Sequence, residues 1–386
     1  MAQLPHGVLI VLGSNGKSTT TNILTAIVRE HGLSVFTNPT GANLPQGIAS
    51  ALLSEVTLTG RLKREIGVIE VDEAFGEILC RELHPTAAVI LNLQIDQIYR
   101  FYEPERVAAM FSRILGYVSE RVVLNRDDNF LLSLSREVEA ENRLELSFFG
   151  ASQSVLDAAP HGQVLARDYG NEGSTAAAPK SSVYAEVVAL NGNDAVLRIG
   201  DIDHAVRLPV RGLHYAVDTA GALAIAAGAL GDRFDLDVAI RAVEGAKTVY
   251  GRGEVLRDGD VDMEILLLKN LASLQLNLDY LDHTPDSVLF ALDADSRDPS
   301  WLYAADLSRL KYVDVVSGPK AAFLALRLAY EGIPFGVIEP DIVKALGLLR
   351  NTPRPASGIR TLILDYDQMI LTRRHLGYRD LEAGAA

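Results

Sequence analysis

Cysteine is almost absent from this chain, which has Cys80 alone among its 386 residues. A single thiol excludes a disulfide within the chain, and it excludes a zinc site built from several cysteines. Basic residues are also in deficit, because 36 Lys and Arg are outnumbered by 50 Asp and Glu, for a formal net charge of -14. Nucleic-acid-binding proteins need surplus positive charge against the phosphates, so the composition argues against that class.

Long apolar runs are missing as well. No stretch approaches the roughly 18 consecutive apolar residues of a membrane-spanning helix, and the N-terminus has no secretory signal pattern. The sequence therefore predicts no transmembrane segment, and its single cysteine favours a reducing compartment. With 48% hydrophobic and 22% charged residues, the composition is that of a globular protein, and the length favours two domains.

A short apolar run near the start of the chain ends in a glycine turn. Residues 7–12 read Gly-Val-Leu-Ile-Val-Leu, Gly13-Ser-Asn-Gly16 follows, and a helical pattern then extends from Lys17 to about His31. A strand, a glycine turn and a helix in this order are typical of the first unit of a parallel α/β domain.

This glycine turn has the residue types that a phosphate-binding loop requires. Small residues let backbone N–H groups approach a phosphate, and the helix N-terminus adds a favourable field. The lysine can reach the β- and γ-phosphates, and the serine hydroxyl after it can hold Mg²⁺. The predicted nucleotide-binding residues here are Gly13, Ser14, Asn15, Gly16, Lys17, Ser18 and Thr19. The alternative is a glycine turn without a ligand.

Acidic residues follow a second strand candidate, residues 66–71. Alternation places Glu70 and Asp72 on the same side of that strand, and Glu73 begins the turn. In phosphate-loop enzymes a carboxylate at this place binds Mg²⁺ directly or through water, and it helps to position the nucleophile. The alternative is a solvated strand end.

Polar loops follow other strand candidates. Residues 38–43 are rich in hydroxyl and amide groups, and residues 92–97 come just after the strand candidate 87–91. Open α/β sheets bind ligands at the carboxyl ends of their strands, so these loops and the phosphate loop are expected around one crevice. Their convergence supports a nucleotide site more than any single motif does.

The remaining patterns predict two α/β domains with a boundary near Tyr250-Gly-Arg-Gly253. We expect an ATP-binding domain of residues 1–249 and a smaller domain of residues 250–386. Residues 150–182 are rich in Ala, Gly, Ser and Pro, and we interpret them as a mobile loop or an insertion. Alternating runs up to residue 210 predict a small antiparallel β insertion. Strands predicted after the boundary are residues 263–268, 287–292, 312–316, 335–338 and 361–364.

The loop Gly13-Ser-Asn-Gly-Lys-Ser-Thr-Thr20 resembles the phosphate loop of the Mur ligases and related amide-forming enzymes. Further segments resemble the MurT-like members of this family, in family order and over nearly the whole chain. These segments are residues 38–43, 70–74, 96–100, 125–128, 208–213, 251–254, 269–270 and 298–301. The resemblance implies a Mur ligase-type P-loop ATPase domain with a mainly parallel sheet, followed by a Rossmann-like α/β C-terminal domain.

The resemblance also implies an activity. MurT-like proteins use ATP and Mg²⁺ to phosphorylate the α-carboxylate of D-glutamate in the lipid II stem peptide, and ammonia then displaces phosphate to leave D-isoglutamine. A GatD-like glutamine amidotransferase subunit supplies the ammonia. Such an enzyme works in the cytoplasm, at the inner face of the membrane, in peptidoglycan biosynthesis.

By carry-over from the family, Lys17, Ser18 and Glu70 hold nucleotide and metal, with Thr40 as a second metal contributor. Two asparagines, Asn92 and Asn125, stand where the family has loops close to the nucleotide, and Arg252 is expected to reach phosphate. Asp298 resembles the aspartate that completes the partner's Cys–His glutaminase site by orienting the histidine. The alternative for Asp298 is a turn cap before Pro299.

The sequence departs from the family at several points. MurT-like proteins usually carry a four-cysteine zinc ribbon, and residues 150–182 stand in its place without a cysteine, so we expect no zinc. The family's Lys-Asn-Pro-Ala-Gly reads Lys269-Asn-Leu-Ala-Ser273, and a Tyr-Asn pair reads His214-Tyr215. The main alternative function is a stand-alone ligase that adds an amino acid, as folylpolyglutamate or poly-γ-glutamate synthetases do. A third is a degenerate binding scaffold.

Overall fold

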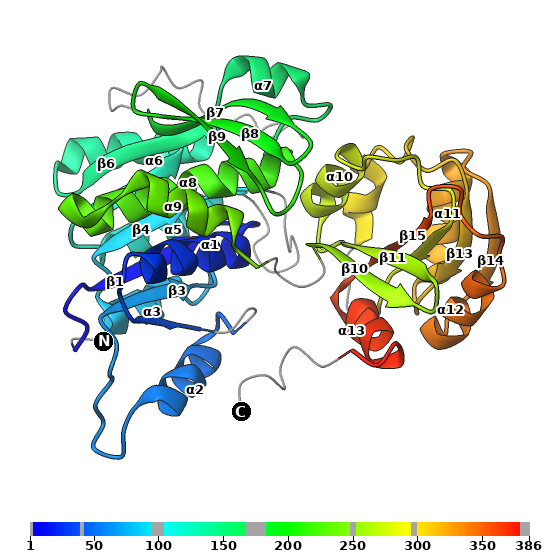
Figure 1. Ribbon diagram of the computed structural model, residues 1–386, viewed down its shortest axis with the longest axis horizontal. Coiled ribbons are helices and arrows are strands. Elements are labelled where there is room, and N and C mark those ends of the chain that lie inside the picture. Colours follow the sequence, from blue (N-terminus) through cyan, green and yellow to red (C-terminus); the bar gives the residue numbers. More distant parts are fainter. Residues whose placement is uncertain are drawn as a thin grey trace. The chain divides into compact units, whose positions relative to one another are not determined.

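The computed structural model describes residues 3–38, 42–94, 104–166, 183–247, 252–294 and 299–378. The described residues up to Lys247 form one compact unit, and those from Arg252 onward form a second. Both units are α/β, as the sequence predicts (Figure 1).

A nine-stranded sheet organises the first unit, in the order β2-β3-β1-β4-β5-β6-β7-β8-β9. Neighbouring strands are parallel from β2 to β7, and β8 and β9 add antiparallel. The strands are β1 (Val8–Leu12), β2 (Val35–Thr37), β3 (Ile66–Glu70), β4 (Ala87–Ile90), β5 (Arg121–Asn125), β6 (Glu145–Ala151), β7 (Val183–Asn191), β8 (Asp194–Ile199) and β9 (Ile202–Arg207). The predicted antiparallel insertion is confirmed, and it continues the main sheet through β7.

Helices cover both faces of this sheet. The helices are α1 (Lys17–Glu30), α2 (Pro45–Glu55), α3 (Gly76–Leu83), α5 (Pro104–Leu115), α6 (Asn129–Glu141), α7 (Gln153–Ala158), α8 (Leu213–Leu230) and α9 (Leu236–Glu244). On one face, α1 packs against α8 and α9; on the other, α5 packs against α3 and α6. Parallel strands covered on both faces bury almost every side chain, which explains why β1, β3 and β4 read as continuous apolar runs.

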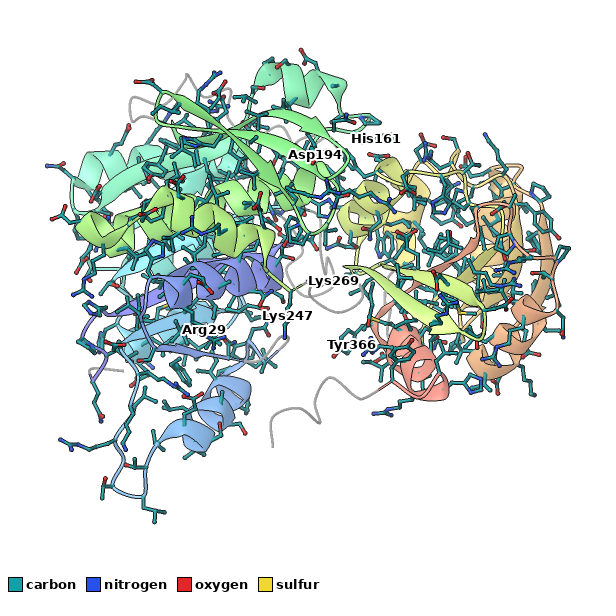
Figure 2. The ribbon with its side chains drawn as sticks, viewed as in Figure 1. Arg29, His161, Asp194, Lys247, Lys269 and Tyr366 are labelled. Atoms are coloured by element: carbon teal, nitrogen blue, oxygen red, sulfur yellow. The ribbon has the colours of Figure 1, made fainter. Side chains whose placement is uncertain are left out.

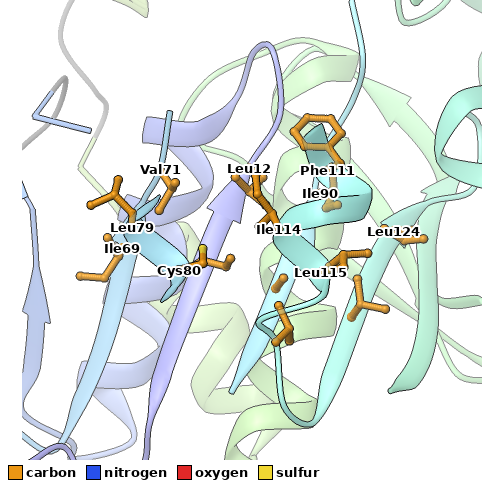
Figure 3. Close-up of a cluster of buried hydrophobic side chains, with 14 of the residues drawn as sticks. Leu12, Ile69, Val71, Leu79, Cys80, Ile90, Phe111, Ile114, Leu115 and Leu124 are labelled. Atoms are coloured by element: carbon orange, nitrogen blue, oxygen red, sulfur yellow. The ribbon is translucent and has the colours of Figure 1, made fainter. Parts of the chain in front are cut away.

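The core under α3 and α5 is built from these strands. Leu12, Ile69 and Ile90 contribute from the sheet, and Cys80 and Phe111 pack onto them from the helices (Figure 3). The Cys80 side chain has no solvent exposure, and burial raises the pKa of its thiol to about 12. Cys80 is therefore a core residue in its neutral form and not a nucleophile.

Residues 150–166 correct the sequence prediction of a mobile loop. Gly150 and Ala151 complete β6, α7 follows directly, and the side chains of Val164 and Leu165 are buried. The composition of this segment did not predict the end of β6, because this strand is stabilised by pairing with β5 and β7 and not by a periodic pattern of its own. Residues 167–182 lie outside the described part of the chain.

The segment Leu213–Arg233, which contains α8, is the one described helix long and apolar enough to cross a membrane by length and composition. In the structure 78% of its most apolar window is buried inside the first unit. Small residues such as Ala220 and Gly221 let it lie close against the sheet, so the helix is a core element here.

A six-stranded sheet organises the second unit, in the order β10-β11-β15-β12-β13-β14. All its neighbours are parallel except β10 and β11. The strands are β10 (Arg252–Asp258), β11 (Val261–Leu267), β12 (Val288–Ala291), β13 (Val313–Ser317), β14 (Phe335–Glu339) and β15 (Ile359–Leu364), and the helices are α10 (Leu271–Asp279), η3 (Pro299–Ala304), α11 (Ala321–Tyr330), α12 (Ile342–Arg350) and α13 (Tyr366–His375). The second, mainly parallel sheet is confirmed, and the antiparallel β10 was not predicted.

Candidate functional site

The phosphate loop connects β1 to α1 and has a backbone that only glycine adopts without strain. Gly13 has φ 139° and Gly16 has φ 84°. A Cβ on Gly16 would lie 2.3 Å from Oδ1 of Asp218 in α8, and a Cβ on Gly13 would lie 3.0 Å from Cβ of Leu91. Both positions therefore require glycine, because the backbone has a positive φ and neighbouring elements leave no room for a Cβ.

Side chains from the loop after β4 fix the phosphate loop in place. The Asn15 backbone N–H donates to Asn92 Oδ1 (3.0 Å), and Asn92 Nδ2 donates back to the Asn15 carbonyl (3.1 Å). The Asn15 side chain donates to Gln94 Oε1 (2.6 Å), and the Ser14 hydroxyl accepts from the Gln94 backbone N–H (3.0 Å). Asn92, predicted to bind the cofactor, is in this conformation a support for the loop.

Lys17 opens α1 with its side chain almost completely buried. Its ammonium Nζ donates to the Gly13 carbonyl and to Glu73 Oε1, the latter at 2.6 Å. The side chains of Lys17 and Glu73 are only 8% and 7% exposed, so this ion pair is screened little by solvent. Glu73 was not among the predicted site residues, although it is the third carboxylate after β3 and could have been considered on that ground.

Ser18 and Glu70 meet directly, as their shared predicted role as metal ligands requires. The Ser18 hydroxyl donates to Glu70 Oε2 at 2.7 Å, and Asn43 Nδ2 donates to Glu70 Oε1 at 2.9 Å. The strand end that carries Glu70 is held by Asn38, whose side chain bonds both the Glu70 N–H and its carbonyl. Hydroxyl and carboxylate oxygens are the ligand types that Mg²⁺ takes beside phosphate and water, so these residues fit that ion.

Among the described residues, no group of three His, Cys, Asp or Glu side chains lies close enough together to hold a metal ion. β3 ends at Glu70, two residues before Asp72, and Asp72 Oδ1 accepts from the Ala74 backbone N–H at 3.1 Å.

The Asn125 side chain lies in the protein interior and not at the surface of the phosphate loop. The side chain has no solvent exposure, and its Nδ2 donates to the Leu91 carbonyl and to Gln163 Oε1, both at 2.9 Å. Gln163 in turn donates from Nε2 to Asp127 Oδ2 at 2.6 Å. Asn125 was predicted to contact the nucleotide, but in this structure its amide faces the protein interior and helps to hold the loop after β4.

Two predicted site residues lie outside the part of the chain that the structure describes, and a third has no described side chain. Thr40 and Asp298 fall in residues 39–41 and 295–298, and Arg252 begins β10 without a described side chain. Their predicted roles stay predictions. Thr19 is in the first turn of α1, and its side chain is buried.

The second unit also has polar residues at the carboxyl ends of its parallel strands. Asp365 follows β15 and caps α13, and its Oδ2 accepts from the Asp293 backbone N–H after β12 at 2.5 Å. Burial, which outweighs two backbone hydrogen bonds, raises the pKa of Asp365 to about 6, with Asp293 and Asp367 adding to the effect. Lys269 and Tyr366, labelled in Figure 2, follow β11 and β15 at the same end of the sheet.

Comparisons with known proteins identify the family of the chain. Residues 11–226 match the model of the Mur ligase middle domain. The MurT subunit of lipid II isoglutaminyl synthase (glutamine-hydrolyzing) from Streptococcus pneumoniae is 26% identical over 361 residues, which cover 85% of this chain and 78% of that protein. The corresponding subunit from Staphylococcus aureus (strain COL) is 24% identical over 371 residues, 89% of this chain and 82% of that protein.

Solved structures support the fold. The structure of a MurF ligase from Thermotoga maritima in complex with ADP has a TM-score of 0.67 and 20% sequence identity, and it covers 99% of this chain and 82% of its own. The family match and the similarity to the MurT subunits indicate an ATP-dependent ligase. The chain belongs to the Mur ligase family, and within it the chain is similar to the MurT subunits over most of its length.

Proposed function

We propose that this ligase amidates the α-carboxylate of D-glutamate in the lipid II stem peptide, with ammonia from a GatD-type glutaminase subunit. The observation that carries the proposal is the pair of contacts Lys17–Glu73 and Ser18–Glu70 at the start of α1, within a chain similar to MurT subunits over 85% of its length. The name of those relatives describes a glutamine-hydrolysing enzyme of more than one subunit. The substrate is membrane-attached, so the enzyme would act at the cytoplasmic face.

The chemistry balances in two steps. A carboxylate oxygen of D-glutamate attacks the γ-phosphorus of ATP, and the bond to the β–γ bridging oxygen breaks to release ADP. Ammonia then attacks the carbonyl carbon of the acyl phosphate, loses a proton, and displaces phosphate. Activation is needed because a free carboxylate is a poor electrophile, while phosphate is a good leaving group.

The residues of this chain supply charge and orientation to the first step. Mg²⁺, when bound, would neutralise phosphate charge. Ser18 and Glu70 would hold that ion, since their oxygen atoms already converge. Lys17 would exchange the Glu73 carboxylate for a phosphate oxygen, because both partners are anionic and the ammonium lies at the N-terminus of α1. Backbone N–H groups at the N-terminus of α1 would add further donors to the phosphates.

The test is mass spectrometry of lipid II incubated with the purified protein, Mg²⁺ and ATP, with ammonium as nitrogen source. Replacement of a hydroxyl by an amino group at D-glutamate, dependent on ATP, is the expected result. Lys17→Ala should reduce the rate on the order of 100- to 1000-fold, as loss of a preorganised charge contact does. ATP hydrolysis that depends on a free amino acid and a folate or glutamyl acceptor, without amidation, would support the stand-alone ligase instead.

Asp298→Asn separates the two subunits' roles. With glutamine and the GatD-type subunit, amidation should fall strongly, while amidation driven by ammonium should stay near the rate of the unaltered protein. Equal loss with both nitrogen sources would place Asp298 in the ligase site and not in the glutaminase.

A further inference from the structure

A cavity of about 410 Å³ lies in the first unit, between the sheet and the C-terminal half of α8. Two of its lining residues, Arg121 and Glu145, begin β5 and β6 and are paired in register at the N-terminal ends of these strands. The phosphate loop follows the C-terminal end of β1, which runs parallel to them in the same sheet. The cavity therefore lies at the opposite edge of the sheet from the candidate nucleotide site, and its volume is that of a small-molecule site.

Helix α8 spans the distance between the two places. Asp218 in its first half lies beside Gly16 of the phosphate loop, whereas Gly228 in its second half lines the cavity. Ten residues, from 218 to 228, at about 1.5 Å each give a separation of about 15 Å along the helix. A small molecule in the cavity therefore does not occupy the place of the nucleotide.

The Arg121 guanidinium brings positive charge to the cavity wall. Its side chain is 22% exposed, and its ionic contact is with Glu145, at 3.5 Å between Nη2 and Oε2. No oxygen in the described part of the chain accepts a hydrogen bond from this guanidinium. Glu145 is 70% exposed, so the pair is screened by solvent and contributes little. Because a guanidinium has five donors in a planar fork that matches a carboxylate, Arg121 can bind an anion in the cavity and give up only a weak contact.

Gly228 makes room for this guanidinium. A Cβ at residue 228 would lie 2.4 Å from Nη1 and 3.0 Å from Cδ of Arg121. Glycine weakens a helix interior relative to alanine, and here it lets the arginine side chain approach α8 closely. The backbone of α8 therefore helps to set the position of the charge.

Two hydroxyl side chains also line the cavity. Tyr184 of β7 stands at a bulge, because the register between β6 and β7 shifts between Phe148 and Phe149, and bulges re-aim side chains. Ser147 of β6 is the second hydroxyl, and neither hydroxyl makes a hydrogen bond to another described residue. Burial raises the pKa of Tyr184, so its hydroxyl keeps the proton and can donate it to an acceptor in the cavity.

The rest of the wall is mainly apolar. Val123 of β5, Ala224 of α8 and Phe234 after α8 contribute to it. The Phe234 ring is stacked on the ring of His31, with 5.6 Å between centroids and an interplanar angle of 7°. This stacking fixes the ring, so the cavity offers a preformed apolar surface beside the charge and the hydroxyls.

We infer that this cavity binds a small organic acid, with its carboxylate on Arg121 and Tyr184 and its apolar or aromatic body against α8 and Phe234. The inference concerns a second ligand site and does not rest on the proposed function. A carboxylate suits the site because its two oxygens accept from the guanidinium fork and from a hydroxyl together. An apolar body suits it because the alanine, valine and phenylalanine side chains exclude water from that part of the ligand.

The experiment is a fluorine NMR titration of the full chain with para-fluorobenzoate, and with para-fluorobenzamide as the neutral probe of the same shape. Arg121→Gln should raise the Kd for para-fluorobenzoate at least tenfold, and Tyr184→Phe should raise it about fivefold through loss of one hydrogen bond. Gly228→Ala leaves every charge in place and should also raise the Kd, because its Cβ displaces the guanidinium. Arg81→Gln is the matched control, since Arg81 of α3 also lies 3.5 Å from a carboxylate, that of Glu82, and is 61% exposed. It should bind like the unaltered protein.

Saturating Mg²⁺–ADP distinguishes this cavity from the phosphate loop. We expect the Kd for para-fluorobenzoate to stay the same when the nucleotide is present. Loss of probe binding with Mg²⁺–ADP would place the probe in the nucleotide site and overturn the inference. An unchanged Kd in Arg121→Gln, or equally tight binding of para-fluorobenzamide, would also overturn it, as would the absence of any binding at about 10 mM probe.

Discussion

Replacing Glu73 by glutamine tests how the phosphate loop is organised before nucleotide binds. In the structure the Lys17 ammonium is buried between the Gly13 carbonyl and the Glu73 carboxylate, with the carboxylate at 2.6 Å. Removing one member of a buried ion pair costs about 3–5 kcal/mol, because the other charge is left without a partner. Glutamine keeps an acceptor oxygen at this place, so Glu73→Gln loses only the difference between a charge-assisted and a neutral hydrogen bond, about 1–2 kcal/mol.

For a unit of this size, 1 kcal/mol corresponds to about 2–4 °C in Tm. We therefore expect the Tm of the first unit to fall by about 2–8 °C in the Glu73→Gln variant without nucleotide. With saturating Mg²⁺–ADP or a non-hydrolysable ATP analogue, Lys17 gains phosphate as its partner and no longer depends on Glu73. Most of the lost stability should then return, so the nucleotide-induced rise in Tm should be larger in the variant than in the unaltered protein.

Differential scanning calorimetry with and without nucleotide measures both quantities, with the transition of the second unit as an internal reference. An equal Tm loss in both conditions would mean that Lys17 keeps Glu73 as its partner in the bound state. No loss in either condition would mean that the pair does not stabilise the loop. Either result refutes the exchange of Glu73 for phosphate.

The other two predictions concern a glycine and an aspartate. An alanine in a left-handed backbone costs about 1–2 kcal/mol of folding free energy. Gly16→Ala should destabilise the first unit by more than this, because the new Cβ would lie 2.3 Å from Asp218, and it should abolish nucleotide binding. Gly32→Ala is the matched control, with φ +82° and no atom within 4 Å, and denaturant titration with a nucleotide-binding assay should show the backbone cost alone. Asp365 has a folded-state pKa of about 6 against 3.8 in the unfolded chain, so its proton binding makes the second unit lose stability as pH rises from about 4 to about 6. This difference in pKa corresponds to about 3 kcal/mol of folding free energy. Asp365→Asn keeps the cap of α13 and should remove this contribution to the pH dependence of stability. Identical pH–stability profiles for the variant and the unaltered protein would contradict the prediction.

The sequence indicated the parts of the candidate site that depend on short stretches of chain. Gly13 and Gly16 were identified because small residues let backbone N–H groups approach a phosphate, and both have the positive φ that glycine adopts without strain. Glu70 was identified because it stands at the end of a buried-strand candidate, where phosphate-loop enzymes place a Mg²⁺-binding carboxylate. The contact between Ser18 and Glu70 followed once β1 and β3 were neighbours in a parallel sheet.

Residues with several polar neighbours were harder to assign. Asn92 and Asn125 were both placed near the nucleotide, yet one side chain supports the loop backbone and the other has no solvent exposure. An asparagine after a strand offers the same donors and acceptors to a ligand or to a backbone, so its residue type cannot decide between them. Strand β6 was missed for a related reason, since its pairing with β5 and β7 lies outside any local window.

The sequence by itself determined the α/β class of both units and the strand, glycine turn and helix at the start of the chain, because these follow from apolar periodicity and from backbone angles that few residues adopt. Only the tertiary structure decided that Glu73, 56 residues away, is the partner of Lys17, and that Arg327 joins η3 to α11. Both contacts bring together residues that are distant in the chain. Their energies depend on burial and on angstrom-scale distance, and neither quantity exists until the sheet and its helices have packed.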